Sequence, residues 1–360
     1  MNAITPNPLL GVGWHTVGAG FAANCYSPQK YVKRWSWEIY WLAQASWCWL
    51  LWPIIGALLT IPHLSQVLAE APKDRMLLSF LFGVAYGVGG MAFNVSIRYI
   101  GFALTYSIAV GLSSILGTLV PPLVHGQFHE ILSRTGSSWL LTGVVAGAAG
   151  IALCGAAGHF KERDLDANRG SHAGFSLTKG LLLSFLAGIL SAVYGFALDA
   201  AAPIADVAEQ HGAGIWKGNV GYIFANTGAF VTSFLYCAYL MRKNKSAGEF
   251  SRLRSNVPGE TGGSLPANYL LAFLTGTLWY GQFFFYNLGH VRLGKDYAFS
   301  SWALHMIILV LISNLVGILF REWKGCGSRT KTAISFGLLV LCAAVLMLTY
   351  GNYLGEPPAK

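Results

Sequence analysis

Charged side chains are scarce in this sequence. Asp, Glu, Lys and Arg make up only 11% of the 360 residues, against about 25% in average soluble proteins. Hydrophobic residues account for 54%, and the mean hydropathy is +0.51. Acidic residues also avoid the middle of every long apolar stretch. This balance excludes an ordinary soluble domain and predicts an all-α polytopic membrane protein.

The sequence also lacks the motifs of metal, redox and nucleotide chemistry. Its six cysteines are scattered, without the spacing of metal ligands or of a redox pair. No Walker sequence is present, and the glycine-rich runs lie inside apolar stretches with no strand before them. We therefore expect no metal and no cofactor. A transporter of this kind would draw its energy from an ion gradient, such as a proton gradient.

Ten apolar stretches are long enough to cross a bilayer, which takes roughly 20 residues of helix. They cover residues 9–26, 37–61, 76–97, 102–124, 138–158, 180–200, 216–240, 268–290, 297–320 and 332–353. The stretches are continuously apolar and do not alternate in polarity, which favours helices.

Positive charge is sorted between alternate connecting segments. The segments after the first, third, fifth, seventh and ninth predicted spans hold most of the Lys and Arg residues. By the positive-inside rule these segments are cytoplasmic, so both chain termini are expected outside. The net charge of +9 then reports orientation and attraction to membrane lipid. The basic residues form no single long patch, so nucleic acid is not an expected partner.

The spans are predicted to form two inverted repeats of five helices. Residues 1–158 would be the first repeat, 159–179 a flexible cytoplasmic linker, and 180–360 the second repeat, with a long, flexible cytoplasmic loop at 241–267. An odd number of spans per half requires the halves to insert in opposite senses. Inverted repeats are a common basis of alternating access, which favours a transporter.

A sparse internal echo supports this division. Residues of the third and fourth spans recur in the eighth and ninth at an offset of 193 positions. The matches include Gly83 with Gly276, Asn94 with Asn287 and Ser107 with Ser300.

Small residues recur at four-residue spacing within several spans. Gly83 and Gly87 are one such pair, and Gly143 and Gly147 are another. This spacing predicts close helix–helix packing, because small residues let two backbones approach in lipid.

Polar residues inside spans are costly and are the first candidates for function. In the eighth predicted span, Trp279, Gln282, Tyr286 and His290 fall on one helical face. Aromatic rings that stack on a sugar ring, beside groups that hydrogen-bond to its hydroxyls, make a surface suited to a sugar. An aromatic helix that simply packs in the bundle remains the alternative.

Three further candidates lie on the ninth predicted span: Ser301, Trp302 and His305, with Ser301 and His305 one turn apart. At about 1.5 Å per residue, His305 lies about 12 Å deep, Gln282 at a similar depth, and His15 of the first span about 9 Å deep. These depths predict that polar groups from several helices converge near the midplane. Direct contact with substrate and plain packing both remain open for the two histidines.

The candidate proton carriers are His15, His305, His290 and Glu38. A histidine has an ordinary pKa of about 6.5, so it loads and releases a proton near neutrality. Glu38 lies at the start of a span, where the helix dipole alone is a sufficient reason for a carboxylate.

Several short motifs carry a family resemblance. They are Trp35-Ser36-Trp37-Glu38, Arg98-Tyr99, the run from Leu278 to Tyr286, Gly289-His290 with Arg292, and the run from Ser301 to Met306. With these motifs the chain resembles the L-rhamnose/proton symporter family of the drug/metabolite transporter superfamily over almost its whole length.

The resemblance implies ten helices, a bacterial inner membrane, and uptake of L-rhamnose or similar sugars together with a proton. Asn287, the segment Gly294–Asp296 and the long 241–267 loop depart from the family pattern and leave the sugar preference open. Export or exchange of a drug or metabolite is the alternative within transport. A membrane-embedded transferase is a further one, but the few, dispersed acidic residues disfavour it. The sequence does not give the oligomeric state.

Overall fold

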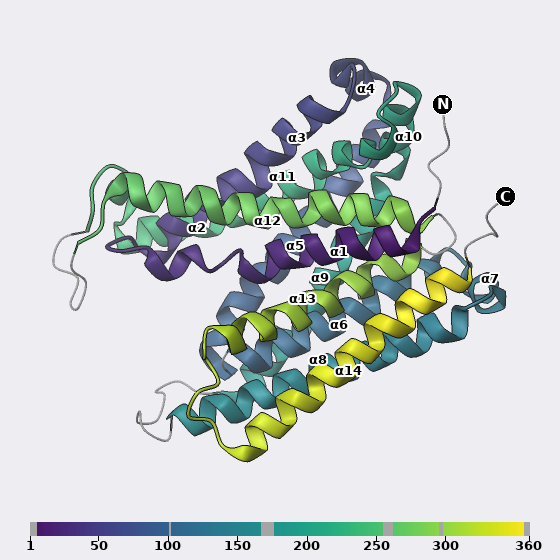
Figure 1. Ribbon diagram of the computed structural model, residues 1–360. Coiled ribbons are helices and arrows are strands. Elements are labelled where there is room, and N and C mark those ends of the chain that lie inside the picture. The colour runs from purple at the N-terminus through teal and green to yellow at the C-terminus, as the bar shows by residue number, and fades with distance from the viewer. Residues whose placement is uncertain (1–5, 101, 167–175, 255–261, 295–297, 356–360) are drawn as a thin grey trace. The chain divides into compact units, whose positions relative to one another are not determined.

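The structure is a computed structural model that describes residues 6–100, 102–166, 176–254, 262–294 and 298–355. The described chain is helical, with no strand (Figure 1). Its main helices are α1 (Pro8–Asn24), α2 (Trp37–Ala45), α3 (Trp52–Thr60), α5 (Lys73–Ile100), α6 (Phe102–Val124), α8 (Ser137–Asp166), α9 (Leu177–Ala200), α11 (Asn219–Asn244), α12 (Leu265–Leu293), α13 (Ser301–Leu319) and α14 (Ser328–Leu354). Shorter elements are η1 (Pro28–Tyr31), η2 (Ser46–Leu51), α4 (Leu64–Glu70), α7 (Phe128–Ser133), α10 (Ala202–Gln210), η3 (Gly214–Trp216), η4 (Ala247–Phe250) and η5 (Ala298–Ser300).

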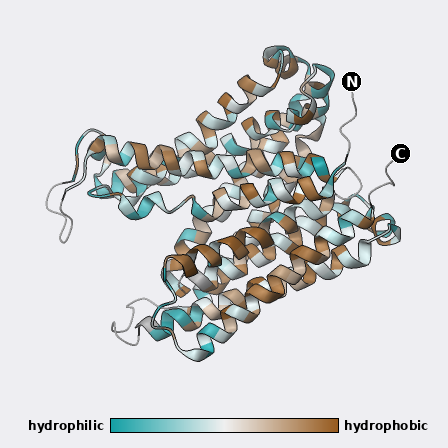
Figure 2. Cartoon of the chain, viewed as in Figure 1, coloured by the Kyte–Doolittle hydropathy of each residue, from teal (hydrophilic) through white to brown (hydrophobic). Residues whose placement is uncertain are grey.

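Every predicted span coincides with a helix, so the prediction of an all-α polytopic membrane protein is confirmed. In the described residues, eight helical segments are long and apolar enough to cross a membrane. α1 and α12 are not among them. α1 has only 17 residues, and α12 has 29 but carries many aromatic and polar side chains, which is why it is paler in Figure 2.

The chain folds into two compact units, which we describe separately. Unit 1 comprises Met1–Ala23, Gly89–Phe196 and Phe285–Lys360, and unit 2 comprises Asn24–Val88 and Ala197–Phe284. Each unit therefore takes helices from both halves of the sequence. This grouping is a different division from the predicted pair of five-helix halves, which stays a prediction.

In unit 1, α8 packs along α14, and α6 and α13 pack beside them (Figure 1). Glycines on α8 make the close approach possible. A Cβ on Gly143 would lie 3.1 Å from the backbone nitrogen of Leu348, and one on Gly150 would lie 3.1 Å from that of Leu341. Leu341 and Leu348 are fully buried in the apolar core that results. The predicted close packing at small residues is confirmed here.

In unit 2, α11 packs against α2, η2 and α3. α5 also meets α11 backbone to backbone, since a Cβ on Gly83 would lie 2.0 Å from the carbonyl oxygen of Ala225. α12 approaches the α2–η2 helix in the same manner, since a Cβ on Gly276 would lie 2.9 Å from the carbonyl oxygen of Gln44. Alanine fits at neither position without a shift of backbone.

Two segments that were expected to be flexible are partly ordered. Helix α8 continues to Asp166, so the connection after the fifth span is shorter than the predicted 159–179 linker. Within 241–267, Glu249 is buried and its carboxylate accepts hydrogen bonds from the backbone N–H and the hydroxyl of Ser36, at 2.6 and 2.9 Å. That order comes from a contact distant in sequence, which loop composition does not reveal.

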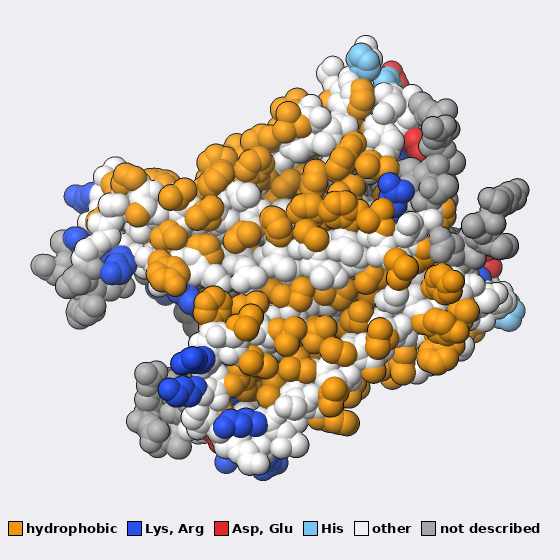
Figure 3. Space-filling view, in the orientation of Figure 1, with side chains coloured by type: hydrophobic (Ala, Val, Ile, Leu, Met, Phe, Trp, Pro, Cys, Tyr) orange, Lys and Arg blue, Asp and Glu red, His pale blue; other side chains and the backbone are white. Residues whose placement is uncertain are grey.

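Large apolar side chains cover the outer faces of the helices in both units (Figure 3). Leu59 and Leu235 in unit 2, and Leu182, Leu339 and Leu346 in unit 1, are more than half exposed. Apolar exposure on this scale fits contact with lipid tails and is unusual for a surface in water.

Candidate functional site

α1 and the end of α12 meet closely in unit 1, and this contact positions His15. A Cβ on Gly289 would lie 2.7 Å from Cδ2 of His15 and 3.0 Å from the carbonyl oxygen of Gly11. The imidazole therefore occupies space that a side chain at position 289 would fill. His15 is 0% exposed as a result.

A cluster of rings surrounds His15, with members from α1, α12 and α13. The His15 ring centroid lies 5.2 Å from that of Tyr286 and 5.7 Å from that of His305. Tyr286 and His305 meet edge to face at 5.4 Å, and His290 stacks on Tyr286 at 5.8 Å. We call His15, Tyr286, His290, Ser301 and His305 the imidazole cluster. Of the three candidates whose depth was predicted from the sequence, the structure brings His15 and His305 together, whereas Gln282 belongs to unit 2.

Ser301 pairs with a ring nitrogen of the imidazole cluster. Its Oγ lies 2.9 Å from Nε2 of His15, within hydrogen-bond distance. Among the described residues, Nδ1 of His15, of His290 and of His305 has no hydrogen-bond partner. In a membrane interior an unpaired ring nitrogen is costly, so these atoms are open positions for a proton or a ligand.

Trp302 closes one side of the imidazole cluster. Its ring meets Tyr286 edge to face at 5.8 Å, and its indole N–H donates to the Ser113 carbonyl oxygen at 3.0 Å. The indole also lies on Gly117 of α6, where a Cβ would come within 2.7 Å of it. Ser113 and Gly117 hold this ring in place, and neither was among the predicted site residues.

The remaining candidates belong to unit 2. Trp279 is buried, donates its indole N–H to the hydroxyl of Tyr26 at 3.3 Å, and meets Trp49 edge to face at 5.2 Å. Gln282 is buried as well. The Glu38 carboxylate accepts hydrogen bonds from Ser246 Oγ at 2.6 Å and from Asn244 Nδ2 at 2.9 Å. Those contacts tie the start of α2 to the end of α11, and they are separate from the helix dipole considered for Glu38.

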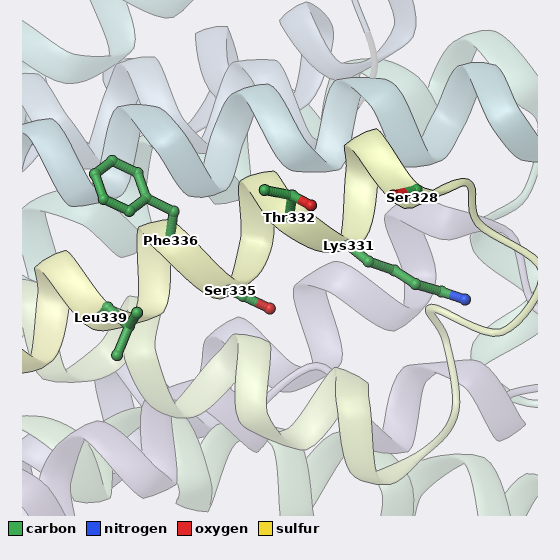
Figure 4. Close-up of a pocket in the computed structure, with 6 residues that line it drawn as sticks. All are labelled: Ser328, Lys331, Thr332, Ser335, Phe336 and Leu339. Carbon is green, nitrogen blue, oxygen red and sulfur yellow. The ribbon is translucent and has the colours of Figure 1, made fainter.

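A depression on α14 is a different kind of feature. Figure 4 shows that the residues lining it, Ser328, Lys331, Thr332, Ser335, Phe336 and Leu339, all come from one helix. A surface built from a single helix encloses no ligand, so we assign no function to it. Two residues of the segment that departs from the family pattern, 295 and 296, lie outside the described residues.

Comparison with known proteins identifies the family. The sequence model of the L-rhamnose-proton symport protein (RhaT) family matches residues 1–352. The chain belongs to this family. An L-rhamnose-proton symporter of Cronobacter sakazakii is 34% identical over 351 residues, which cover 97% of this chain and 98% of that protein. Symporters of the same name from Pectobacterium atrosepticum and Escherichia coli are 34% and 33% identical, each over at least 96% of this chain and 98% of the relative.

Membership of the L-rhamnose-proton symport protein family confirms the resemblance seen in the motifs. The match covers all residues of the imidazole cluster and the candidates of unit 2. Sequence reasoning missed Gly289 and Gly11 as the residues that admit His15. The Gly289-His290 pair was noted as a family motif. Its role in the close approach of two helices becomes visible only once the neighbouring helix is known.

Proposed function

We propose that this protein imports L-rhamnose, or a sugar of similar shape, together with a proton. The observation that supports this most is its identity with L-rhamnose-proton symporters along nearly the full length of both chains. Such a protein is a secondary transporter and not an enzyme, and the proton gradient takes the place of a cofactor. A sugar carries no charge, and its binding needs aromatic faces and hydrogen-bonding groups of the kind found in unit 1.

In this proposal the imidazole cluster serves both sugar and proton. Tyr286 and Trp302 offer ring faces, and Ser301 with the open imidazole nitrogens offers hydrogen bonds to hydroxyls. We assign the proton to His305, which is 2% exposed, because the imidazole is the side chain whose ordinary pKa lies nearest to neutral pH. Proton and sugar then occupy neighbouring groups, so that the binding of one affects the other.

The proposal includes ten spans arranged as two inverted repeats. The unit boundaries support it. They fall near the ends of α1 and α9, the first spans of the two halves, and inside α5 and α12, the third spans. Gly83 and Gly276, which are 193 positions apart, also make equivalent close contacts with the second span of the opposite half. The third span of each half therefore makes the same kind of close contact with the second span of the other half.

We further propose a bacterial inner membrane location with both termini periplasmic. In unit 1, α1 begins and α14 ends at the same end of the unit (Figure 1). Basic residues gather at its other end, where α8 ends and α14 begins (Figure 3). This end carries Lys161, Arg163, Lys324, Arg329 and Lys331. By the positive-inside rule it faces the cytoplasm.

Transport in proteoliposomes tests the function directly. With an inward proton gradient, labelled L-rhamnose should accumulate, and rhamnose added outside should raise the external pH. One charge moved across 100 mV corresponds to about 2.3 kcal/mol, which allows roughly fiftyfold accumulation of a neutral sugar. A protonophore should reduce this to simple equilibration. Uptake that is unchanged by the protonophore would contradict the proposed proton coupling. No uptake of any sugar in a panel of similar sugars would contradict the proposed substrate class.

A further inference from the structure

Trp49 differs from the other buried tryptophans in its hydrogen bonding. It is 3% exposed, and its indole N–H has no hydrogen-bond partner among the described residues. The other buried tryptophans of the described chain, Trp41, Trp279 and Trp302, donate their indole N–H to protein acceptors. The partly buried Trp35 and Trp52 do the same. An indole can only donate, so the unmet requirement at Trp49 is for an acceptor.

The backbone around Trp49 is irregular in a way that has an identifiable cause. Trp49 lies in η2, a π-helical stretch between α2 and α3. Pro53 follows four residues later and has no N–H for the Trp49 carbonyl, which disfavours regular α-helix at this point. Short π-helical stretches are frequent at functional sites.

The position of Trp49 also suits a transported solute. The continuous helical segment Trp37–Thr60 has 24 residues and qualifies as a membrane span. Trp49 lies about 18 Å along it from Trp37, close to its middle, at about 1.5 Å per residue. An unmet donor at this depth has no bulk water to satisfy it.

Aromatic rings of unit 2 flank Trp49. Its ring meets Trp41 edge to face at 6.0 Å and Trp279 edge to face at 5.2 Å. Trp41 in turn stacks on Trp37 at 5.0 Å. Rings of this kind supply the apolar faces on which a sugar ring stacks, and the indole N–H of Trp49 can fix the orientation of the sugar through a hydrogen bond.

We propose that the Trp49 indole N–H donates a hydrogen bond to one hydroxyl oxygen of the transported sugar. Trp49 is thus a specificity-determining residue that the sequence did not single out. This inference depends on the proposed function, because it takes the transported solute to be a sugar. A sugar hydroxyl is a suitable partner, since it accepts a hydrogen bond and carries no charge whose burial would be costly.

A binding titration with purified protein in nanodiscs tests this contact. Trp49→Phe removes the donor and keeps an aromatic ring, and we expect it to weaken L-rhamnose binding about tenfold, the range of one neutral hydrogen bond. Trp52→Phe is the matched control. Its N–H donates to Thr277 at 2.9 Å, so this variant should bind rhamnose like the unmodified protein. If Trp49→Phe does not fold, a tryptophan isostere with sulfur in place of the ring N–H, placed at position 49, removes the donor at constant size.

Deoxy analogues of rhamnose identify the partner. Each hydroxyl is replaced by hydrogen in turn, and each analogue is titrated against both proteins. One analogue should bind the unmodified protein about tenfold more weakly than rhamnose does, and Trp49→Phe should bind that analogue and rhamnose equally. Equal rhamnose affinity in the two proteins, or the same pattern of losses in both, would overturn the proposal. Failure of the unmodified protein to bind rhamnose would instead count against the proposed function.

Discussion

At the scale of single residues, His305 is the sharpest test of the coupling mechanism. We expect His305→Asn to abolish accumulation of rhamnose driven by a proton gradient, from roughly fiftyfold at 100 mV to equilibration. Exchange of labelled for unlabelled sugar across the membrane should persist, because exchange needs no net proton movement. Uptake and counterflow in the same proteoliposomes measure both quantities.

The control for His305 is His129→Asn. His129 is exposed on α7 and lies outside the imidazole cluster, so both uptake and counterflow should be unchanged. If His305→Asn still accumulates rhamnose, the proton must be carried by another group of the imidazole cluster. Loss of counterflow as well would assign His305 to sugar binding.

Much of the imidazole cluster could be predicted from the sequence, and the reason is geometric. Polar residues in a bilayer are few, and helix rise converts position into depth, so His15 and His305 could be paired before the fold was known. Trp49 could not be found in this way. A tryptophan in an apolar span is common, and only the structure reveals that the N–H of Trp49 has no partner within the described part of the chain while that of Trp52 has one.

At the scale of elements, the contact of α1 with α12 depends on Gly11 and not on the nearby Gly13. A Cβ on Gly11 would lie 2.9 Å from the Leu293 side chain and 3.2 Å from the Gly289 carbonyl oxygen, whereas one on Gly13 meets nothing within 4 Å. We expect Gly11→Ala to destabilise the protein by about 1–3 kcal/mol and to weaken rhamnose binding, because α1 carries His15. Gly13→Ala should be neutral or stabilise by up to about 1 kcal/mol.

Thermal unfolding in nanodiscs and a rhamnose titration compare the two glycine variants. A similar unfolding temperature for both would show that α1 has room to move away from α12. A loss of stability in Gly11→Ala with unchanged rhamnose affinity would separate the packing of α1 from the placement of His15.

The elements themselves were largely predictable, because continuous apolar runs are the strongest signal in a membrane protein. The predicted span 332–353 lies within α14, and 76–97 lies within α5. The π-helical η2 was not predicted, because a hydropathy pattern does not distinguish a short π-helical stretch from the α-helix around it. The order of Glu249 was missed for another reason, since its partner Ser36 is 213 positions away.

At the scale of the whole molecule, the distribution of charged residues and the number of spans together predict on which side of the membrane the two termini lie. The proposed ten spans would place both termini on one side, and by the positive-inside rule the sorting of basic residues would make that side the periplasm. The proposed inverted repeat requires the same even count, because each half would contribute an odd number of spans. Hydropathy and length alone support eight spans in the described chain, so α1 and α12 are the helices on which the count depends.

Reporter fusions in a bacterial host distinguish these counts. Alkaline phosphatase is active only in the periplasm, so a fusion after Lys360 should be highly active, and one after Arg163 should be nearly inactive. Green fluorescent protein at the same two positions should give the reverse result, since it fluoresces when fused on the cytoplasmic side. If α1 stayed outside the membrane while α12 crossed it, only the N-terminus would change sides, and green fluorescent protein fused before Met1 would fluoresce. If α12 failed to cross, the C-terminal phosphatase would be inactive, and the inverted repeat would fail with it.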